Sequence, residues 1–371
     1  MAENIVKLGD YIEEYSVRNK NNENIRVYSV TNTNGFCTEY FDKDVASKDQ
    51  SNYKIVPRGY FAYNPSRVNV GSIDYQNEED RVIVSPLYVV FKADERIDND
   101  YLLNYLKSDV GRMYIKELAS GSVRANLKFS ILKEFPFPLV SIDEQREKMN
   151  VLRGMDRILN ICAELLKKLD EAVKSRFIEM FGDPIKNNKG WETATISDIA
   201  VDVHYGTSRP AVDGGKFPYL RMNNITYDGH LDLSELKYID IPENEIDNCR
   251  VTYGDVLFNR TNSIEKVGKT CVFNLHQDMV IAGYIIRLRI DDRLCPLVLS
   301  TYLNLDSLKR KLRGLAKGAV NQANINAQQM QSIGVYLPPR DLQEEFIKFS
   351  EAADKSKLAV DNIRGTVVTV N

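Results

Sequence analysis

Side chains that commonly carry covalent or metal chemistry are few in this sequence, and their spacing does not suit such chemistry. The three histidines do not stand at metal-ligand spacing, and the five cysteines contain no C-x-x-C pair. We therefore expect ordinary reduced thiols and polar surface histidines, with neither a bound metal nor a disulfide framework. The residues concerned are His204, His230, His276, Cys37, Cys162, Cys249, Cys271 and Cys295.

Nucleotide-binding and base-holding motifs are also missing from the sequence. The stretch VGKT at residues 267–270 resembles the end of a phosphate-binding loop, but that motif needs a glycine five residues before Gly268, where Ser263 stands. No Gly-x-Gly-x-x-Gly follows an expected strand, and most carboxylates lie beside lysines on expected helix faces. We therefore expect a chain that has no catalytic residues and no cofactor of its own.

Loops rich in Arg, Asn, Ser, Thr and Lys offer a different chemistry, the hydrogen bonding of nucleic acid. Arginine pairs with guanine, asparagine and glutamine pair with adenine, and lysine, serine and threonine contact phosphates. In the first half of the chain the candidates are Asn64, Arg67, Asn69, Ser122, Arg124, Asn126 and Lys128, with the stretch TNTNG (31–35) as an addition. In the second half they are Thr207, Ser208, Arg209, Arg221, Asn223, Asn259, Arg260, Asn262, Lys266, Lys269, Lys317, Asn321 and Gln322.

The same residue types also make ordinary turns, and for one loop alone the turn is the better interpretation. Here, however, loops of matching composition stand at matching places in the two halves of the chain. This recurrence favours contact with DNA.

The loops recur because the sequence contains one unit twice. Displacing the chain by about 198 residues places SVRANLKFSILKEFPFPLVSIDEQ over AVNQANINAQQMQSIGVYLPPRDLQ, so that Gln145 falls on Gln343. With a slip of a few residues, RGYFAYN (58–64) matches YGDVLFN (253–259), and Gly71 matches Gly268. Because the period is a whole domain, a pseudo-symmetric pair is expected instead of a solenoid.

Each repeat is predicted to be a mixed domain of strands and helices. Apolar β-branched runs such as RVIVSPLYVVF and GYIIRLRI predict strands. The stretches NDYLLNYLKSDVGRMYIKEL and CPLVLSTYLNLDSLKRKLRGL predict amphipathic helices at equivalent places. The fold class is therefore α+β, with globular domains at residues 1–140 and 183–340 and helices at 141–182 and 341–371.

A long helix is expected after each domain. Ser141 and Glu144 form a capping box at the start of the first helix, and Gly182 and Pro184 mark its end. At about 1.5 Å per residue, the first helix would be about 60 Å long. Apolar residues three and four apart form a heptad seam along both helices. The seam residues are Leu152, Leu159, Leu166, Leu169, Val173, Phe346, Phe349 and Val360.

These two helices are expected to pair as an antiparallel coiled coil that holds the domains apart, the alternative being that each helix packs only on its own domain. The second helix starts in the same way, at Asp341 and Glu344, but the stretch RGTVVTVN after Ile363 is β-branched and contains Gly365. We therefore expect the second helix to be lost there. Paired over residues 342–363, the coiled coil would be roughly 33 Å long, or ~10 base pairs of DNA.

Five stretches together resemble the specificity subunit of type I restriction-modification systems. The resemblance covers almost the whole chain, and no single stretch is specific. The stretches are SIDEQ (141–145), RFIEMFGDPIKNNKGWE (176–192), FPYLRMNNI (217–225), GDVLFNR (254–260) and LPPRDLQEEF (337–346).

The resemblance implies two target recognition domains, each of which reads one half of a bipartite site in double-stranded DNA. It also implies that the helices set the spacing and dock two methyltransferase subunits, and restriction subunits through them. Adenine N6 methylation with S-adenosylmethionine, and DNA cleavage with ATP and Mg²⁺, would belong to those partners.

The bulk composition agrees with a globular protein of two or three domains. The 371 residues are 43% hydrophobic and 27% charged, and no apolar run approaches the ~18 residues that span a bilayer. Because the N-terminus has no signal-peptide pattern, a cytoplasmic protein without membrane contact is expected. The net charge of −3 is unusual for a protein that binds phosphates alone, so local patches or a partner would supply positive charge.

Three other functions stay open from the sequence. The chain could serve a solitary methyltransferase that has no restriction subunit, or it could be a protein-interaction scaffold with two similar domains, which the acidic balance weakly supports. A self-contained nuclease is disfavoured because the sequence lacks a cluster of metal-binding carboxylates.

Overall fold

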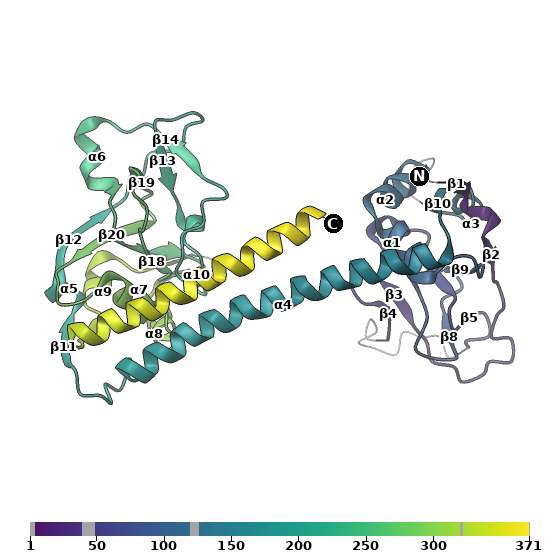
Figure 1. The fold of residues 1–371 in the computed structure, drawn as a ribbon, viewed down its shortest axis with the longest axis horizontal. Helices are drawn as coiled ribbons and strands as arrows, with labels where there is room; N and C mark the ends of the chain where they lie inside the picture. The colour runs from purple at the N-terminus through teal and green to yellow at the C-terminus, as the bar shows by residue number, and fades with distance from the viewer. Residues whose placement is uncertain (1–3, 39–48, 119–125, 320–321, 371) are drawn as a thin grey trace. The chain divides into compact units, whose positions relative to one another are not determined.

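The structure, a computed structural model, describes residues 4–38, 49–118, 126–319 and 322–370 and divides into two compact units. Unit 1 comprises residues 1–157 and unit 2 comprises residues 158–370. One helix, α4 (Ile142–Phe181), contributes its first part to unit 1 and the remainder to unit 2 (Figure 1).

Unit 1 is built on an antiparallel sheet of four strands in the order β2-β9-β6-β7, beside a β5-β8 pair and a β3-β4 hairpin. Its strands are β1 (Asn4–Lys7), β2 (Ile12–Glu14), β3 (Ser29–Thr31), β4 (Gly35–Cys37), β5 (Lys54–Pro57), β6 (Phe61–Tyr63), β7 (Ile73–Tyr75), β8 (Arg81–Val84), β9 (Val89–Ala93) and β10 (Pro136–Leu139). Its helices before α4 are η1 (Leu8–Asp10), η2 (Val68–Val70), α1 (Asn99–Lys107), α2 (Asp109–Leu118) and α3 (Phe129–Leu132).

Unit 2 contains an antiparallel sheet in the order β12-β20-β16-β18, a second sheet in the order β14-β13-β19-β15, and a small sheet, β17-β22-β21. Its strands are β11 (Glu192–Thr195), β12 (Ala200–Tyr205), β13 (Phe217–Leu220), β14 (Lys237–Ile239), β15 (Arg250–Val251), β16 (Val256–Asn259), β17 (Thr261–Asn262), β18 (Thr270–Val272), β19 (Met279–Ile281), β20 (Ile285–Ile290), β21 (Lys317–Ala319), β22 (Gln322–Asn324) and β23 (Gly334–Leu337). Its helices after α4 are α5 (Ile196–Ile199), η3 (Met222–Asn224), α6 (Glu243–Cys249), α7 (Pro296–Asn304), α8 (Asp306–Leu315), α9 (Ala327–Gln331) and α10 (Arg340–Val370).

The two units share one topology. Matched along the chain, β2, β9, β6 and β7 correspond to β12, β20, β16 and β18, and the two sheets have the same strand order. In both units the first strand closes the fold by pairing with the strand that precedes the long helix, as β1 with β10 and as β11 with β23. The predicted repeat and the mixed fold class are confirmed.

Helices pack on each sheet and enclose the main cores. In unit 1, Phe61 and Phe91 stack at 4.9 Å and pack in one buried cluster with Leu102 from α1. In unit 2, Phe258 and Leu299 belong to the corresponding cluster. Each amphipathic run predicted as one helix is divided in two, since extended backbone at a single residue separates α1 from α2 and α7 from α8.

Helix α4 begins and ends where its sequence signals predicted. The hydroxyl of Ser141 accepts a hydrogen bond from the Glu144 amide at 3.3 Å, which satisfies one of the free amides at the helix start. After Phe181, Gly182 has a φ of +85°, the left-handed conformation that glycine adopts with least strain.

Helix α10 differs from the prediction at both ends. It begins at Arg340, so Asp341 lies in the first turn and is not its cap. The predicted loss of the helix in RGTVVTVN is wrong, because α10 continues to Val370. A formed helix adds each residue with one hydrogen bond, and the propensity losses of Gly and β-branched residues are at most about 1 kcal/mol each. The hydroxyls of Thr366 and Thr369 also donate to carbonyls one turn earlier, at 3.0 and 2.8 Å.

A buried glutamine joins each long helix to its unit, and we call these contacts the glutamine joints. Gln145 is fully buried; its Oε1 accepts from the Asp98 amide at 2.9 Å, and its Nε2 donates to the carbonyls of Arg96 and Val140, each at 2.9 Å. The joint therefore ties the first turn of α4 to the start of α1.

Gln343 makes the same three bonds in unit 2. Its Oε1 accepts from the Cys295 amide at 2.7 Å, and its Nε2 donates to the carbonyls of Arg293 and Pro338 at 2.9 and 2.8 Å. The sequence repeat places Gln145 on Gln343, and the structure shows that the two side chains make equivalent hydrogen bonds.

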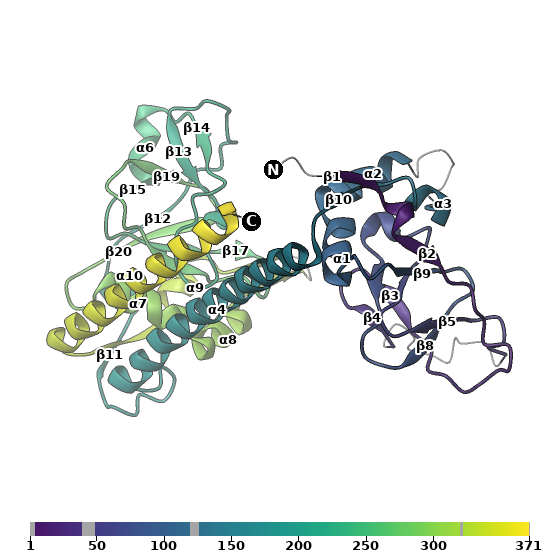
Figure 2. The same cartoon turned by 45° about the vertical axis from the view of Figure 1, so that its right-hand side comes forward.

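Within unit 2, α10 runs beside the later part of α4 in both views (Figures 1 and 2). Phe346 packs edge-on against Phe177 with ring centres 5.3 Å apart, and Lys357 pairs with Asp170 at 2.6 Å. Residue numbers fall along α4 as they rise along α10, so these contacts are antiparallel. These contacts join the two long helices to each other, whereas in the alternative each helix would pack only on its own domain.

The predicted seam residues differ in burial. Phe346 is fully buried, and Val173 packs against the main core of unit 2. Leu152 packs against the core of unit 1, and Phe349 is 38% exposed. The remaining seam residues are half-buried, namely Leu159, Leu166, Leu169 and Val360. A coiled coil along the full seam stays a prediction.

All five cysteines are free thiols, and four of them are buried. Among the residues described, no helix is both long enough and apolar enough to cross a membrane.

Replacing Gln343 with Ala tests the glutamine joint of unit 2. The substitution leaves one amide and two carbonyls without their buried partner, so we expect the free energy of unfolding to fall by about 3 kcal/mol. Urea unfolding followed by the fluorescence of Trp191, the only tryptophan in the sequence, reports unit 2 directly. The matched control is Gln328→Ala on the exposed face of α9, which should change stability by less than about 0.5 kcal/mol. Equal effects of both changes would contradict the role given to the joint.

The Asp170–Lys357 pair provides a test of the α4–α10 contact. Both side chains are largely buried, so a double-mutant cycle with Asp170→Ala and Lys357→Ala should give a coupling energy of about 1–2 kcal/mol in the same unfolding assay. Lys355→Ala, on the exposed face of α10, is the control. Additive single effects would show that the two helices do not meet there in solution.

Candidate nucleic-acid interface

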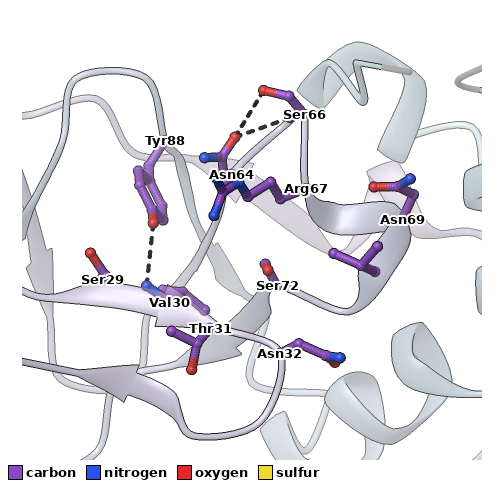
Figure 3. A pocket seen from close by; sticks show the side chains of 11 residues that line it. Ser29, Val30, Thr31, Asn32, Asn64, Ser66, Arg67, Asn69, Ser72 and Tyr88 are labelled. Atoms are coloured by element: carbon purple, nitrogen blue, oxygen red, sulfur yellow. Dashed lines mark hydrogen bonds between the residues drawn. The ribbon is translucent and has the colours of Figure 1, made fainter. Parts of the chain in front are cut away.

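In unit 1, the candidate residues after β6 line an open polar pocket of about 490 Å³. Asn64, Arg67 and Asn69 come from the segment that leaves β6, and Thr31 and Asn32 come from the β3-β4 hairpin (Figure 3). The structure thus brings together two stretches that the sequence placed more than thirty residues apart. The full lining is Ser29, Val30, Thr31, Asn32, Asn64, Ser66, Arg67, Asn69, Val70, Ser72 and Tyr88.

Hydrogen bonds hold the walls of this pocket in place. Asn64 Oδ1 accepts from both the amide and the hydroxyl of Ser66, each at 3.1 Å, and the Tyr88 hydroxyl accepts from the Val30 amide at 3.3 Å (Figure 3). The Leu127 amide donates to the Pro65 carbonyl at 3.0 Å, which fixes the segment after Asn64 against the chain before α3. A fixed set of donors and acceptors is what discrimination between bases requires.

The other candidates of unit 1 lie in the chain before α3. Asn126 and Lys128 are exposed, and Lys128 directly precedes α3. Ser122 and Arg124 lie outside the described residues.

In unit 2, the loop after β12 is held rigidly and presents Arg209. The Thr207 amide donates to Ile281 at 2.9 Å, and the Thr207 hydroxyl accepts from the Arg209 amide at 3.2 Å. The Arg209 guanidinium makes two bonds to Glu245, at 2.9 and 2.6 Å, and these bonds lower the pKa of the Glu245 carboxyl. Ser208 is exposed beside them. Any DNA contact by Arg209 would therefore compete with Glu245.

Arg221 immediately precedes η3, and Asn223 lies within it. The Arg221 guanidinium donates to the Glu235 carbonyl at 3.1 Å, and Asn223 is exposed. The adjacent Asn224 is buried and bonds to the Asp232 carbonyl and the Arg221 amide, so the loop owes its shape to Asn224.

Residues after β16 divide into inner and outer positions. Asn259 is fully buried and donates to the carbonyls of Thr261 and Tyr284, so its role is structural. Arg260 is half-buried, lies over the Tyr205 ring at 4.8 Å and donates to Asn324 Oδ1 at 3.1 Å. Asn262 is half-buried and donates to Asn259. Arg260 and Asn262 therefore keep partial access to a ligand, and Asn259 does not.

Two lysines follow on the same loop and behave differently. Lys266 is exposed. Lys269 is only 7% exposed, and its ammonium donates to the carbonyls of Met222, at 2.8 Å, and Ile225. Burial lowers the pKa of Lys269, with Lys266 as a secondary cause. Lys269 is thus an internal brace between the loop and η3. The sequence alone does not show that Lys269 is buried and Lys266 exposed.

The remaining candidates belong to the small sheet. Lys317 lies in β21 opposite Asn324, and Gln322 in β22 is exposed. Asn321 lies outside the described residues.

The sequence did not single out several residues that shape these surfaces. Ser29, Ser72 and Tyr88 line the pocket of unit 1, and Tyr205 and Glu245 engage the arginines of unit 2. Isolated Ser, Tyr and Glu residues carry no spacing signal, so only the fold could identify them.

Replacing Lys269 with Met tests its role as an internal brace. Two carbonyls lose their donor, so we expect the free energy of unfolding of unit 2 to fall by about 2–3 kcal/mol in the Trp191 fluorescence assay. Lys266→Met removes an exposed lysine from the same loop and should cost less than about 0.5 kcal/mol. If the two variants were equally stable, Lys269 would not be a brace.

Comparison with known proteins shows a family that matches both halves of the chain. Residues 5–174 and again residues 188–363 match the family described as type I restriction modification DNA specificity domain. A protein of Methanocaldococcus jannaschii that bears the name type I restriction enzyme MjaX specificity subunit is 29% identical over 181 residues, 48% of this chain and 41% of its own length. The type I restriction enzyme EcoKI specificity subunit of Escherichia coli K12 is 23% identical over 276 residues, 70% of this chain and 59% of its own length.

The match thus spans about two fifths of the first relative and three fifths of the second. Among solved structures, one chain comes from a study whose title describes complex assembly and conformational transition of the type I R-M system. Its fold matches this chain with a TM-score of 0.57 at 18% identity, and the match covers 100% of this chain and 97% of that one. The S subunit from M. genitalium gives a TM-score of 0.52 at 13% identity, covering 100% and 94%. With one matching domain in each half, the chain belongs to the family of type I restriction-modification DNA specificity domains.

Proposed function

We propose that the chain is the DNA-reading subunit of a type I restriction-modification complex, in which each unit reads one half of a bipartite site. The observation that carries the proposal is that two units of one topology hold donor- and acceptor-rich loops after equivalent strands, β6 and β16. The family match in both halves and the names of the relatives support it.

In this proposal the loops supply base readout. The pocket residues of unit 1, and Arg209, Arg221 and Arg260 of unit 2, offer amide and guanidinium groups of the kinds that pair with adenine and guanine. Each of the three arginines already has a protein partner, so its direction is set before DNA arrives. Preset direction reduces the entropy lost on binding and favours discrimination over simple attraction.

Helices α4 and α10 serve, in the same proposal, as the spacer between half-sites and as the docking surface for two methyltransferase subunits, through which restriction subunits join. This chain has no catalytic role in it. Methylation with S-adenosylmethionine, and cleavage with ATP and Mg²⁺, take place in the partners. The net charge of −3 fits such a division, because partners then supply much of the positive charge that phosphates require.

The test is methylation mapping of DNA from cells that express this chain together with the methyltransferase encoded beside it, against cells that express the methyltransferase alone. We expect a bipartite adenine-methylated motif only when the chain is present. Exchanging residues 1–140 for those of a relative should change one half of the motif and leave the other half intact.

The absence of any motif despite copurification of the two proteins would overturn the proposal. A lack of copurification, with no salt-dependent retention of DNA, would favour a protein-interaction scaffold instead. Magnesium-dependent cutting by the purified chain alone would point to a nuclease.

A further inference from the structure

The pocket of unit 1 contains polar groups that have no protein partner. Among the residues that the structure describes, the side chains of Ser29, Asn32, Asn69 and Ser72 make no hydrogen bond, and Asn64 has a partner only for its oxygen. Ser29 and Ser72 are nonetheless only 8% and 4% exposed. Neither hydroxyl is among the described buried side-chain atoms that lack a hydrogen-bond partner, so solvent reaches both of them, and they are available to a polar ligand that enters the pocket.

The repeat shows what stands at the same place in unit 2. Strand pairing sets Tyr63 opposite Ile73 in unit 1 and Phe258 opposite Thr270 in unit 2. The residue just before each second strand is Ser72 in unit 1 and Lys269 in unit 2. A left-handed glycine precedes both, with φ of +92° at Gly71 and +82° at Gly268. Ser72 and Lys269 are therefore equivalent positions.

The opposite wall of the pocket is equivalent as well. Val27 bridges to Ile83 in parallel, and Tyr219 bridges to Val280 in parallel, at matching points of β8 and β19. Val30 of the pocket wall lies three residues after Val27, and Met222 lies three residues after Tyr219, so the two positions correspond. The Met222 carbonyl accepts a hydrogen bond from Lys269.

In unit 2 the lysine therefore crosses the space that is open in unit 1. Its ammonium bonds to two carbonyls of the opposite wall, and the neighbouring Asn259 is fully buried. In unit 1 the short side chain of Ser72 lies between Asn64 and Arg67 on one side and the strand with Val30 and Thr31 on the other (Figure 3), and Asn64 is half-exposed. One side chain thus separates an open pocket from a closed one.

We propose that the pocket of unit 1 receives a nucleobase edge of the half-site that this unit reads, and that Ser72 keeps it open whereas Lys269 closes the equivalent place in unit 2. The inference rests on the proposed function. Asn32 and Asn69 supply complete amides, the groups that pair with adenine N6 and N7. Asn64 supplies only its amide nitrogen as a donor, because its oxygen accepts from Ser66, and serine hydroxyls complete the lining. The two units accordingly read their half-sites in different ways, unit 1 with a recess and unit 2 with the exposed Arg209 and the half-buried Arg221 and Arg260.

The test is Ser72→Lys, which places in unit 1 the side chain that the same fold accommodates in unit 2. The variant is expressed with the methyltransferase and mapped as above, and the complex is titrated with duplexes that carry the correct motif or a motif altered in one half. We expect preference for the correct unit 1 half-site to fall about tenfold or more, with preference for the unit 2 half-site unchanged. Affinity for unrelated DNA should stay the same or rise, because the change adds positive charge.

Asn77→Lys adds the same charge at an exposed residue that does not line the pocket, and it should leave both preferences intact. Asn69→Ala, at an exposed position of the lining, provides a milder variant and should weaken preference for the unit 1 half-site alone. If Ser72→Lys lowers the preference for both half-sites together, the result for Asn69→Ala decides whether the inference holds. A loss confined to unit 1 supports the inference, and no change overturns it.

Amide hydrogen exchange of β6 and β7 checks that unit 1 of the Ser72→Lys variant is folded. If this folded variant keeps its full preference for the correct unit 1 half-site, the inference is overturned and the proposed function stays intact. A wild-type complex that yields no motif at all would instead overturn the proposed function, and the pocket inference with it.

Discussion

The structure depends above all on a constraint in the first turn of each long helix, where one buried side-chain amide must satisfy three backbone groups. Gln145 and Gln343 each receive one amide hydrogen and supply two. A shorter or apolar side chain would leave these groups unpaired in a buried place. Because the partners lie at the start of α1 or α7 and just before the long helix, the joint fixes the direction in which each helix leaves its own unit.

This constraint separates what the two units share from what distinguishes them. Sheet order, the closing strand pairs and the glutamine joints are the same in both units. The segments between strands differ: unit 1 has a hairpin and a pocket where unit 2 has η3, a braced lysine and arginines paired with acidic or carbonyl groups. A common scaffold thus carries two different polar surfaces.

The sequence predicted the repeat, the strands within residues 81–91 and 283–290, and the limits of α4, because each of these leaves a local pattern of glycine, apolar β-branched residues or capping residues. It did not predict that α10 continues through Gly365, because propensity alone does not end a helix that is already formed. It also could not distinguish Asn259 and Lys269 from Arg260 and Lys266. Inward and outward polar residues have the same types, and only packing decides which of them reach solvent.

The closing strand pairs have a consequence for the order of events during synthesis. Asn4 pairs with Leu139 in unit 1, and Glu192 pairs with Leu337 in unit 2. Each unit is therefore completed only when its last strand has left the ribosome, and the growing chain must keep its first strand unpaired until then. Because α4 follows β10 directly, unit 1 can close and form its glutamine joint while most of unit 2 is still untranslated, so the two similar sequences need not compete for each other's strands.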